Sequence, residues 1–170
     1  MEETITLNEI ENTKIEIVSL QKFIILNVIS FGLYSIWWMY KTWKFFKEKD
    51  NLDIMPVPRA IFAIFFLNGL FEKVQEFAQS KDYTKTFSSL GCFLGVIGFN
   101  IAGKLPEPYF LVSFLSFLFF LPAVEALNYG IRNSNCYEIR DTESFNARQL
   151  ILLIVGGIFW VLVLMGLSVE

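Results

Sequence analysis

The most regular feature of the sequence is a set of long apolar runs separated by charged segments. The runs 23–40 and 150–167 each hold 18 residues without a charged side chain, and the run 87–103 holds 17. A fourth run, 109–128, meets its first charge only at Glu125. About 20 helical residues cross the hydrocarbon core of a bilayer, which is about 30 Å thick. The pattern therefore predicts an all-α integral membrane protein with about four transmembrane helices.

A shorter apolar run lies between the runs 23–40 and 87–103. It covers residues 60–71, and 12 residues make about 18 Å of helix, too little to cross a bilayer. The pattern then becomes amphipathic, and apolar residues recur at helical spacing at Leu67, Leu70, Phe71, Val74, Phe77 and Ala78. We expect a helix here that is either half-embedded or interfacial in the membrane, or packed on the cytoplasmic face of the bundle.

Residues 1–19 form a separate acidic segment with five glutamates. Ile15 and Ile17 alternate with charged residues, as in a strand, so we expect a short hairpin, strands completed by a neighbour, or a disordered tail. A secretory signal would begin with basic residues, and this segment does not. Residues 20–168 are expected to form a single transmembrane domain, with 41–85 as a basic cytoplasmic segment.

The basic residues favour a definite orientation in a membrane. Eight of the 14 Lys and Arg residues fall in 41–85 and three in 129–148. Because positive charge accumulates on the cytoplasmic side, four straight spans would place 11 of them inside and both termini outside. Alternatively, Ser30-Phe31-Gly32 breaks the first span into a re-entrant hairpin, which puts the N-terminus and 13 of the 14 inside.

Composition supports the membrane class and narrows the chemistry. Hydrophobic residues make up 54% of the chain, charged residues make up 18%, and the mean hydropathy is +0.49; soluble domains carry about 25% charged residues. The formal net charge of −3 gives no reason to expect nucleic-acid binding.

The residues that most enzymes use are scarce. The chain has no His, which excludes the common zinc sites and Ser-His triads. Cys92 and Cys136 are expected to be free thiols, and no phosphate-binding glycine motif is present. We therefore predict no catalytic residue, no metal site and no cofactor.

Aromatic residues and lysines crowd the end of the first apolar run. Such residues commonly anchor a helix at the headgroup level of a membrane. We predict a lipid interface formed by Tyr34, Trp37, Trp38, Tyr40, Lys41, Trp43 and Lys44. The alternative is an aromatic pocket that binds a lipid or another ligand.

A line of small residues follows one face of the run 87–103. Its members are Gly91, Gly95, Gly98 and Ala102. Small residues let two helices approach closely in a membrane. We expect this face to pack within the same chain or to form the seam of a homo-oligomer.

Four polar residues within or beside the apolar runs form a candidate polar membrane site: Glu125, Asn128, Asn27 and Asn100. Charged groups inside a bilayer usually face protein or water. Glu125 shares a helix face with Arg132, so it is expected to form an interfacial pair or to contact an ion or substrate. Asn27, Asn68 and Asn100 are expected to hydrogen-bond between helices.

Several short motifs resemble a group of small bacterial inner-membrane proteins of unknown function. The matching segments are 18–23, a Gly-x-Tyr turn at 32–34, the Trp-rich basic segment 37–44, the Arg-Ala-x-Phe segment 59–62, 105–109, 121–122, 126–128 and the glycine pair at 156–157. The resemblance covers most of 18–167. It implies a multi-pass protein of the bacterial inner membrane and no activity.

These features predict a non-enzymatic membrane component, accessory or oligomerising, in an unknown process. Its expected partners are membrane lipids, further copies of itself and an unknown protein. The alternative is a small oligomeric channel, transporter subunit or membrane-permeabilising effector with a path lined by Asn27, Asn100 and Glu125. A third reading, a membrane enzyme that uses Glu125 or Glu76, has less support.

Overall fold

The computed structural model describes residues 14–107, 109–134, 138–141 and 145–167. This part of the chain is helical apart from two strands of four residues each, so the predicted helical fold class is confirmed. The elements in chain order are β1 (Lys14–Ile17), α2 (Leu20–Ile29), α3 (Leu33–Lys49), α4 (Pro56–Ile61), α5 (Ala63–Gln79), α6 (Ser89–Ile101), η1 (Ala102–Lys104), η2 (Tyr109–Phe120), α7 (Leu121–Arg132), β2 (Glu138–Asp141) and α8 (Ala147–Leu167).

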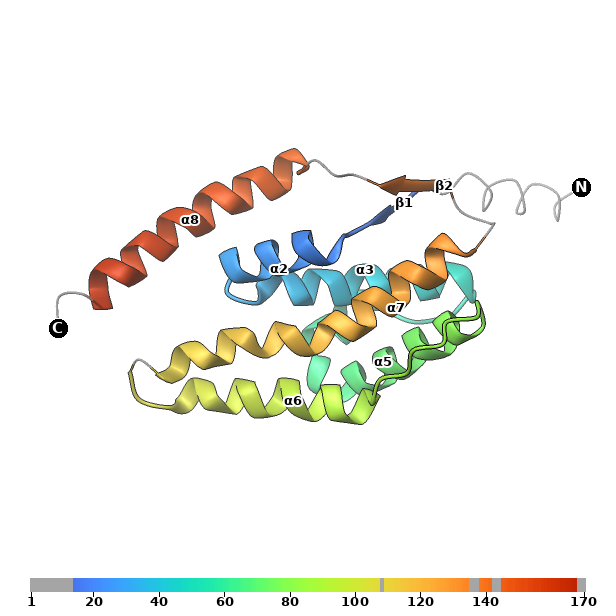
Figure 1. The fold of residues 1–170 in the computed structure, drawn as a ribbon, viewed down its shortest axis with the longest axis horizontal. Helices are drawn as coiled ribbons and strands as arrows, with labels where there is room; N and C mark the ends of the chain where they lie inside the picture. The colour runs from blue at the N-terminus through green and yellow to red at the C-terminus, as the bar shows by residue number, and fades with distance from the viewer. Residues whose placement is uncertain (1–13, 108, 135–137, 142–144, 168–170) are drawn as a thin grey trace, which may run out of the picture.

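The molecule is elongated and has two different ends (Figure 1). At one end, which we name the strand end, lie β1, β2 and the C-terminal ends of α3, α5 and α7. At the other, the turn end, lie the α2–α3 turn, the η1–η2 turn and the C-terminal end of α8. The helices therefore run to and fro between these ends, and α8 lies along one side of the molecule.

The first predicted span is not one helix. Phe31 and Gly32 both have positive φ, of 54° and 85°, a conformation that glycine adopts without strain. The chain turns back there, so the Phe23 and Trp38 rings lie 6.0 Å apart between centroids. A straight helix would separate residues at this spacing by about 22 Å. The straight span over 23–40 is wrong, and the structure has the hairpin of the alternative.

Four transmembrane helices are not supported. Two helices are long and apolar enough to cross a membrane, Tyr109–Arg132 and Gln149–Gly166. The predicted span 87–103 corresponds to the shorter apolar helix Ser89–Lys104, which begins where the Ser88 hydroxyl accepts a hydrogen bond from the Gly91 N–H. The helix over 109–132 changes from 3-10 to α geometry at Leu121-Pro122.

The amphipathic pattern of α5 is confirmed. Its buried residues are the six that the helical spacing selects: Leu67, Leu70, Phe71, Val74, Phe77 and Ala78. This face of α5 packs against α7 and α6. Residues 67–78 are therefore packed on the bundle, which is one of the two alternatives proposed. Ile61, Phe62, Ile64 and Phe65 before them remain exposed.

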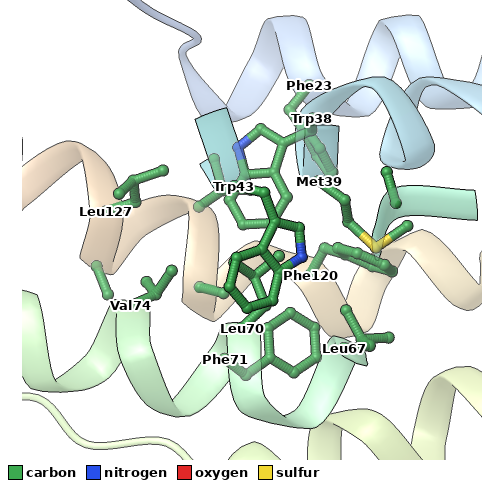
Figure 2. Close-up of a cluster of buried hydrophobic side chains, with 14 of the residues drawn as sticks. Phe23, Trp38, Met39, Trp43, Leu67, Leu70, Phe71, Val74, Phe120 and Leu127 are labelled. Atoms are coloured by element: carbon green, nitrogen blue, oxygen red, sulfur yellow. The ribbon is translucent and has the colours of Figure 1, made fainter. Parts of the chain in front are cut away.

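Aromatic rings at the junction of three layers form the centre of the core (Figure 2). Phe23 of α2 lies 6.0 Å from Trp38 of α3 and 6.4 Å from Phe120 at the end of η2. Phe120 in turn lies 5.4 Å from Phe71 of α5. Edge-to-face contacts of this kind add roughly 0.5–1.5 kcal/mol each beyond the burial of area. They join the α2–α3 hairpin, α5 and η2–α7 into one unit.

The strand predicted around Ile15 and Ile17 is confirmed as β1. Its partner is β2 of the same chain, paired in parallel with Ile15 opposite Ile139. The rest of the acidic segment before β1, residues 1–13, lies outside the described residues. β1 and β2 close the strand end above α3 and α7 (Figure 1).

Candidate functional site

A cavity of about 1010 Å³ lies between α3, α7, β1 and the start of α8. Because α8 touches the rest of the chain mainly along α2, its first turns stand away from α3 and leave this space. The cavity is partly open to its surroundings. It is the best candidate for a binding site among the described residues.

One face of α3 forms the floor of the cavity, and its polarity changes along the helix. Leu33, Tyr34, Trp37 and Trp38 line the part nearer the turn end. Lys41, Lys44 and Glu48 line the part nearer the strand end, together with Thr42 and Phe45. These residues recur every three or four positions, as required of one helix face. The floor therefore runs from apolar and aromatic to charged over about 22 Å.

The opposite wall comes from segments that are distant in sequence. Two hydrogen bonds hold these segments together. The Asn128 side-chain N–H of α7 donates to the Val18 carbonyl oxygen at 2.8 Å, and the Asn146 side-chain N–H donates to the Glu16 carboxylate at 3.3 Å. The wall includes Ile15, Glu16, Val18, Leu127, Asn128, Ile131, Asn146, Gln149 and Leu152.

The charged part of the cavity has one lysine that is not neutralised by a neighbouring acid. Lys44 lies 3.5 Å from the Glu48 carboxylate, one helical turn away. Lys41 instead lies 5.7 Å from the centroid of the Trp37 ring, and within the described part of the chain it forms no ion pair. An exposed ammonium group beside an aromatic ring is suited to bind an anionic group of a ligand.

The predicted lipid-interface group divides between core and surface. Tyr34, Trp38 and Trp43 are buried, so the prediction that they face lipid is wrong. Trp37 is 46% exposed and lies 5.3 Å from the Tyr40 ring. Lys41 and Lys44 are also exposed. Trp43 does not line the cavity, whereas Tyr34 and Trp38 lie on its floor but are largely covered by neighbouring residues.

The positions of the glycine line differ in how closely the rest of the chain packs on them. A Cβ at Gly95 would lie 2.3 Å from the Phe119 ring of η2, so this glycine permits close packing within the chain. A Cβ at Gly91 would meet only Ser88, and one at Gly98 would meet nothing within 4 Å. Close packing within the same chain is therefore confirmed at Gly95, and Ala102 begins the turn η1.

The predicted polar membrane site is dispersed. Glu125 forms an ion pair with Lys85, 2.7 Å away, and not with Arg132 as expected. This hydrogen bond raises the pKa of Lys85. Asn27 is fully buried and accepts a hydrogen bond from the Ser35 hydroxyl at 2.7 Å, which confirms an interhelical bond.

Asn100 and Asn128, the other two asparagines of the predicted polar site, have different hydrogen-bond partners. Asn100 donates to the carbonyl oxygen of Val96 in its own helix, so its predicted interhelical bond is wrong. Asn128 is the one member of the group that lines the cavity.

Groups for catalysis are not assembled at the cavity. Glu16 and Glu48 line it, but each carboxylate is engaged, by Asn146 and Lys44 respectively. Among the residues that the structure describes, no group of three or more His, Cys, Asp or Glu side chains is placed to hold a metal ion. The arrangement is suited to binding.

Sequence reasoning missed Glu16, Asn146 and Gln149 as lining residues. They lie in the first strand and at the start of the last helix, and no local pattern brings them together. The α3 face was visible in the sequence, because the aromatic and basic residues recur at helical spacing. Comparisons with protein families, with curated proteins and with solved structures found no match.

Proposed function

We propose that this protein is a non-enzymatic integral membrane protein that binds a membrane phospholipid in the cavity beside α3. The observation that carries the membrane part is the exposure of α8. Its apolar window Gln149–Gly166 has a mean hydropathy of 2.5, yet only 6% of that window is buried within the chain. The core helix of a soluble protein would be mostly buried, and a signal sequence would lie near the N-terminus. An apolar helix without protein cover requires lipid around it.

The two ends of the molecule then fit two sides of a membrane. We place α8 and the helix Tyr109–Arg132 across the bilayer, with the α2–α3 hairpin entering from the strand end and returning. The shorter helix Ser89–Lys104 lies beside Tyr109–Arg132 and brings the chain to the far side. Lys104, beside the η1–η2 turn, is the basic residue left at the far side. The other 13 of the 14 Lys and Arg residues belong to segments that start or end towards the strand end, which favours a cytoplasmic strand end. The resemblance described above favours a bacterial inner membrane.

The polarity of the cavity supports a phospholipid as the ligand. Trp37 and Leu33, which are both exposed, offer apolar surface for an acyl chain at the level of the apolar helices. Lys41 offers a cation for the phosphate nearer the strand end. Amphipathic ligands need this order of contacts, because the acyl chain must stay in the hydrocarbon layer while the headgroup stays at the interface.

Native mass spectrometry of the detergent-purified protein tests the bound lipid. We expect the unaltered protein to retain one phospholipid, and Lys41→Ala combined with Trp37→Ala to lose it. The matched control is Lys47→Ala, an exposed lysine of α3 outside the cavity, which should retain the lipid. Equal retention by all three proteins, or no lipid on the unaltered protein, would contradict the proposal.

Single-cysteine labelling in intact cells tests the orientation. In a chain without Cys92 and Cys136, a cysteine at Lys104 should react with an impermeant maleimide added outside. A cysteine at Lys81, beyond the C-terminal end of α5, should react only after the membrane is opened. Reaction of both or neither from outside would contradict the arrangement.

A further inference from the structure

A second exposed apolar surface lies away from the cavity, on α4 and the first turn of α5. Six of its side chains are between 53% and 77% exposed: Met55, Val57, Ile61, Phe62, Ile64 and Phe65. We name these six residues the wedge. In the sequence the wedge is bounded by Asp53 and Glu72, and between these two acids the only charged residue is Arg59.

The backbone explains why the aromatic tips of the wedge stay outside. Pro56 and Pro58 begin α4, where a missing N–H costs nothing. The helix is interrupted at Phe62, whose N–H donates to the Pro58 carbonyl oxygen at 2.8 Å, and α5 begins at Ala63. The buried face of α5 begins only at Leu67, so Phe62 and Phe65 precede the part of the helix that packs on the bundle.

Arg59 is held at the edge of the wedge by two aromatic rings. Its guanidinium carbon lies 4.7 Å from the centroid of the Trp43 ring and 5.0 Å from that of Phe66. Within the described part of the chain it forms no ion pair. Cation–π contacts fix the orientation of the group and leave its N–H donors available, and a guanidinium fork matches a phosphate group well.

We propose that the wedge inserts into the cytoplasmic leaflet and that Arg59 binds the phosphate of an anionic phospholipid there. This inference rests on the proposed function, because it requires a bilayer around α8 and the helix Tyr109–Arg132 with the strand end on the cytoplasmic side. It adds a second lipid site, on the face of α3 that carries Trp43 and not on the cavity face. Interfacial helices bind anionic membranes through exposed apolar and aromatic side chains with cations beside them, and the wedge with Arg59 offers both kinds of contact.

Position-specific fluorescence tests insertion of the wedge. The environment-sensitive dye NBD is attached to single cysteines at Phe62, Phe65, Leu162 or Gln79 in the cysteine-free chain, reconstituted in phosphatidylglycerol and phosphatidylethanolamine vesicles. Leu162 of α8 reports on embedding of the whole protein, and Gln79 at the end of α5 is the aqueous control. We expect nitroxide-labelled lipids to quench the dye at Phe62, Phe65 and Leu162, and not at Gln79.

The outcomes separate the two proposals. Quenching at Leu162 without quenching at Phe62 and Phe65 would overturn the wedge and leave the membrane proposal standing. Absence of quenching at all positions would overturn both. Protection of Phe62 and Phe65 from lipid and aqueous quenchers alike would mean that protein covers the wedge, which also overturns the inference.

Titration with phosphatidylglycerol tests the role of Arg59. Binding is measured by native mass spectrometry, and all variants carry Lys41→Ala, which removes the lipid contact in the cavity. Charge-assisted hydrogen bonds to phosphate are worth enough that Arg59→Gln should weaken binding roughly tenfold. Arg59→Lys keeps the charge and should retain part of the affinity. Lys49→Gln is the matched control, since Lys49 also lies over a ring, that of Phe77, but is already paired with Asp50. Equal affinity of Arg59→Gln and its parent would overturn the site.

Discussion

The helices α5 and α8 differ in what covers them. α5 buries six residues along one face against the bundle and presents Glu72, Lys73, Glu76 and Gln79 on the other side. α8 contributes only Gly156 to the buried set of its apolar window, and residues 150–167 include no charged side chain. Its chief contacts are with α2, where the Trp160 ring N–H donates to the Val28 carbonyl oxygen at 2.8 Å.

The difference separates two kinds of driving force. An amphipathic helix packs because water is expelled from one of its faces, and its polar face remains hydrated. A helix that is apolar on every side buries little of its surface in one narrow contact, so most of its apolar side chains would stay exposed to water. Lipid around the helix removes this exposure and stabilises it. The following predictions test this distinction, beginning with the largest expected effect.

Charges on α8 should oppose membrane insertion. Ile158 and Leu162 are both exposed on α8, and an arginine at the centre of a spanning helix costs about 2.5–3.5 kcal/mol. Ile158→Arg combined with Leu162→Arg should therefore disfavour insertion by about 5–7 kcal/mol. A glycosylation reporter fused after α8 measures the inserted fraction. The paired control is Gln75→Arg with Gln79→Arg on α5, which should insert as the unaltered chain does; the same result for both pairs would remove the distinction.

A buried ring and an exposed ring of α5 should have very different effects on stability. Phe71 is fully buried and lies 5.4 Å from the Phe120 ring, whereas Phe65 is 77% exposed. Phe71→Ala should lower the free energy of unfolding by about 3–5 kcal/mol, because it leaves a cavity in the core. Phe65→Ala should change it by less than about 0.5 kcal/mol. Denaturant unfolding in detergent measures both, and a comparable loss for Phe65→Ala would show that the wedge is packed against protein.

Two glycines of α6 should respond in opposite directions. A Cβ at Gly95 would overlap the Phe119 ring, and one at Gly98 would meet nothing within 4 Å. Gly95→Ala should cost about 1–3 kcal/mol through overpacking. Gly98→Ala should be neutral or stabilise by up to about 1 kcal/mol, because alanine favours a helix. Thermal unfolding measures both, and destabilisation by Gly98→Ala together with loss of an oligomer would instead support the homo-oligomer seam.

Loss of the ion-pair cluster at the end of α3 should give the smallest change in stability. Asp50 accepts from Lys49 at 2.6 Å and from Lys73 at 2.7 Å, which ties the end of α3 to α5. Partial burial opposes ionisation of Asp50, but the hydrogen bonds from these lysines outweigh it and lower the pKa of the carboxyl group. The ionised form therefore stabilises the fold above the ordinary pKa of about 3.9, and this contribution is lost as the pH falls through the lowered pKa.

Asp50→Asn should accordingly lower the stability by about 0.5–1 kcal/mol at pH 7, as expected of a partly exposed cluster. The difference from the unaltered protein should shrink as the pH falls below about 4. Unfolding measured across this pH range checks the sign. A difference that grows at low pH would show that the carboxyl group is not held ionised.

The sequence predicted the helix faces better than the spans. The six buried residues of α5 follow from their spacing alone, because helical periodicity is a local property. The break at Gly32 was one of two open alternatives, because a glycine permits positive φ without requiring it. The partner of Glu125 was wrong because Lys85 is 40 residues away and reaches it only through the packing of α5 against α7.

The cavity was predicted only in part. Trp37 and Lys41 were singled out, with an aromatic pocket as the alternative to an anchor. The sequence assigned Tyr34, Trp38 and Trp43 to lipid because they crowd the same segment, yet the packing of α3 against α2, α4 and α5 buries all three. Which face of an aromatic-rich helix is covered depends on its neighbours, and composition does not reveal it.

The sequence by itself determined the helical class, the amphipathic face of α5, the continuous apolar character of α8 and the scarcity of groups for catalysis. These are properties of composition and short-range periodicity. The tertiary structure decided that the first apolar run folds back on itself, that β1 pairs with β2, that Gly95 of the glycine line packs against Phe119, and that a cavity opens beside α3. Each depends on contacts between segments distant in the chain, where the free energy of packing selects one of several locally allowed conformations.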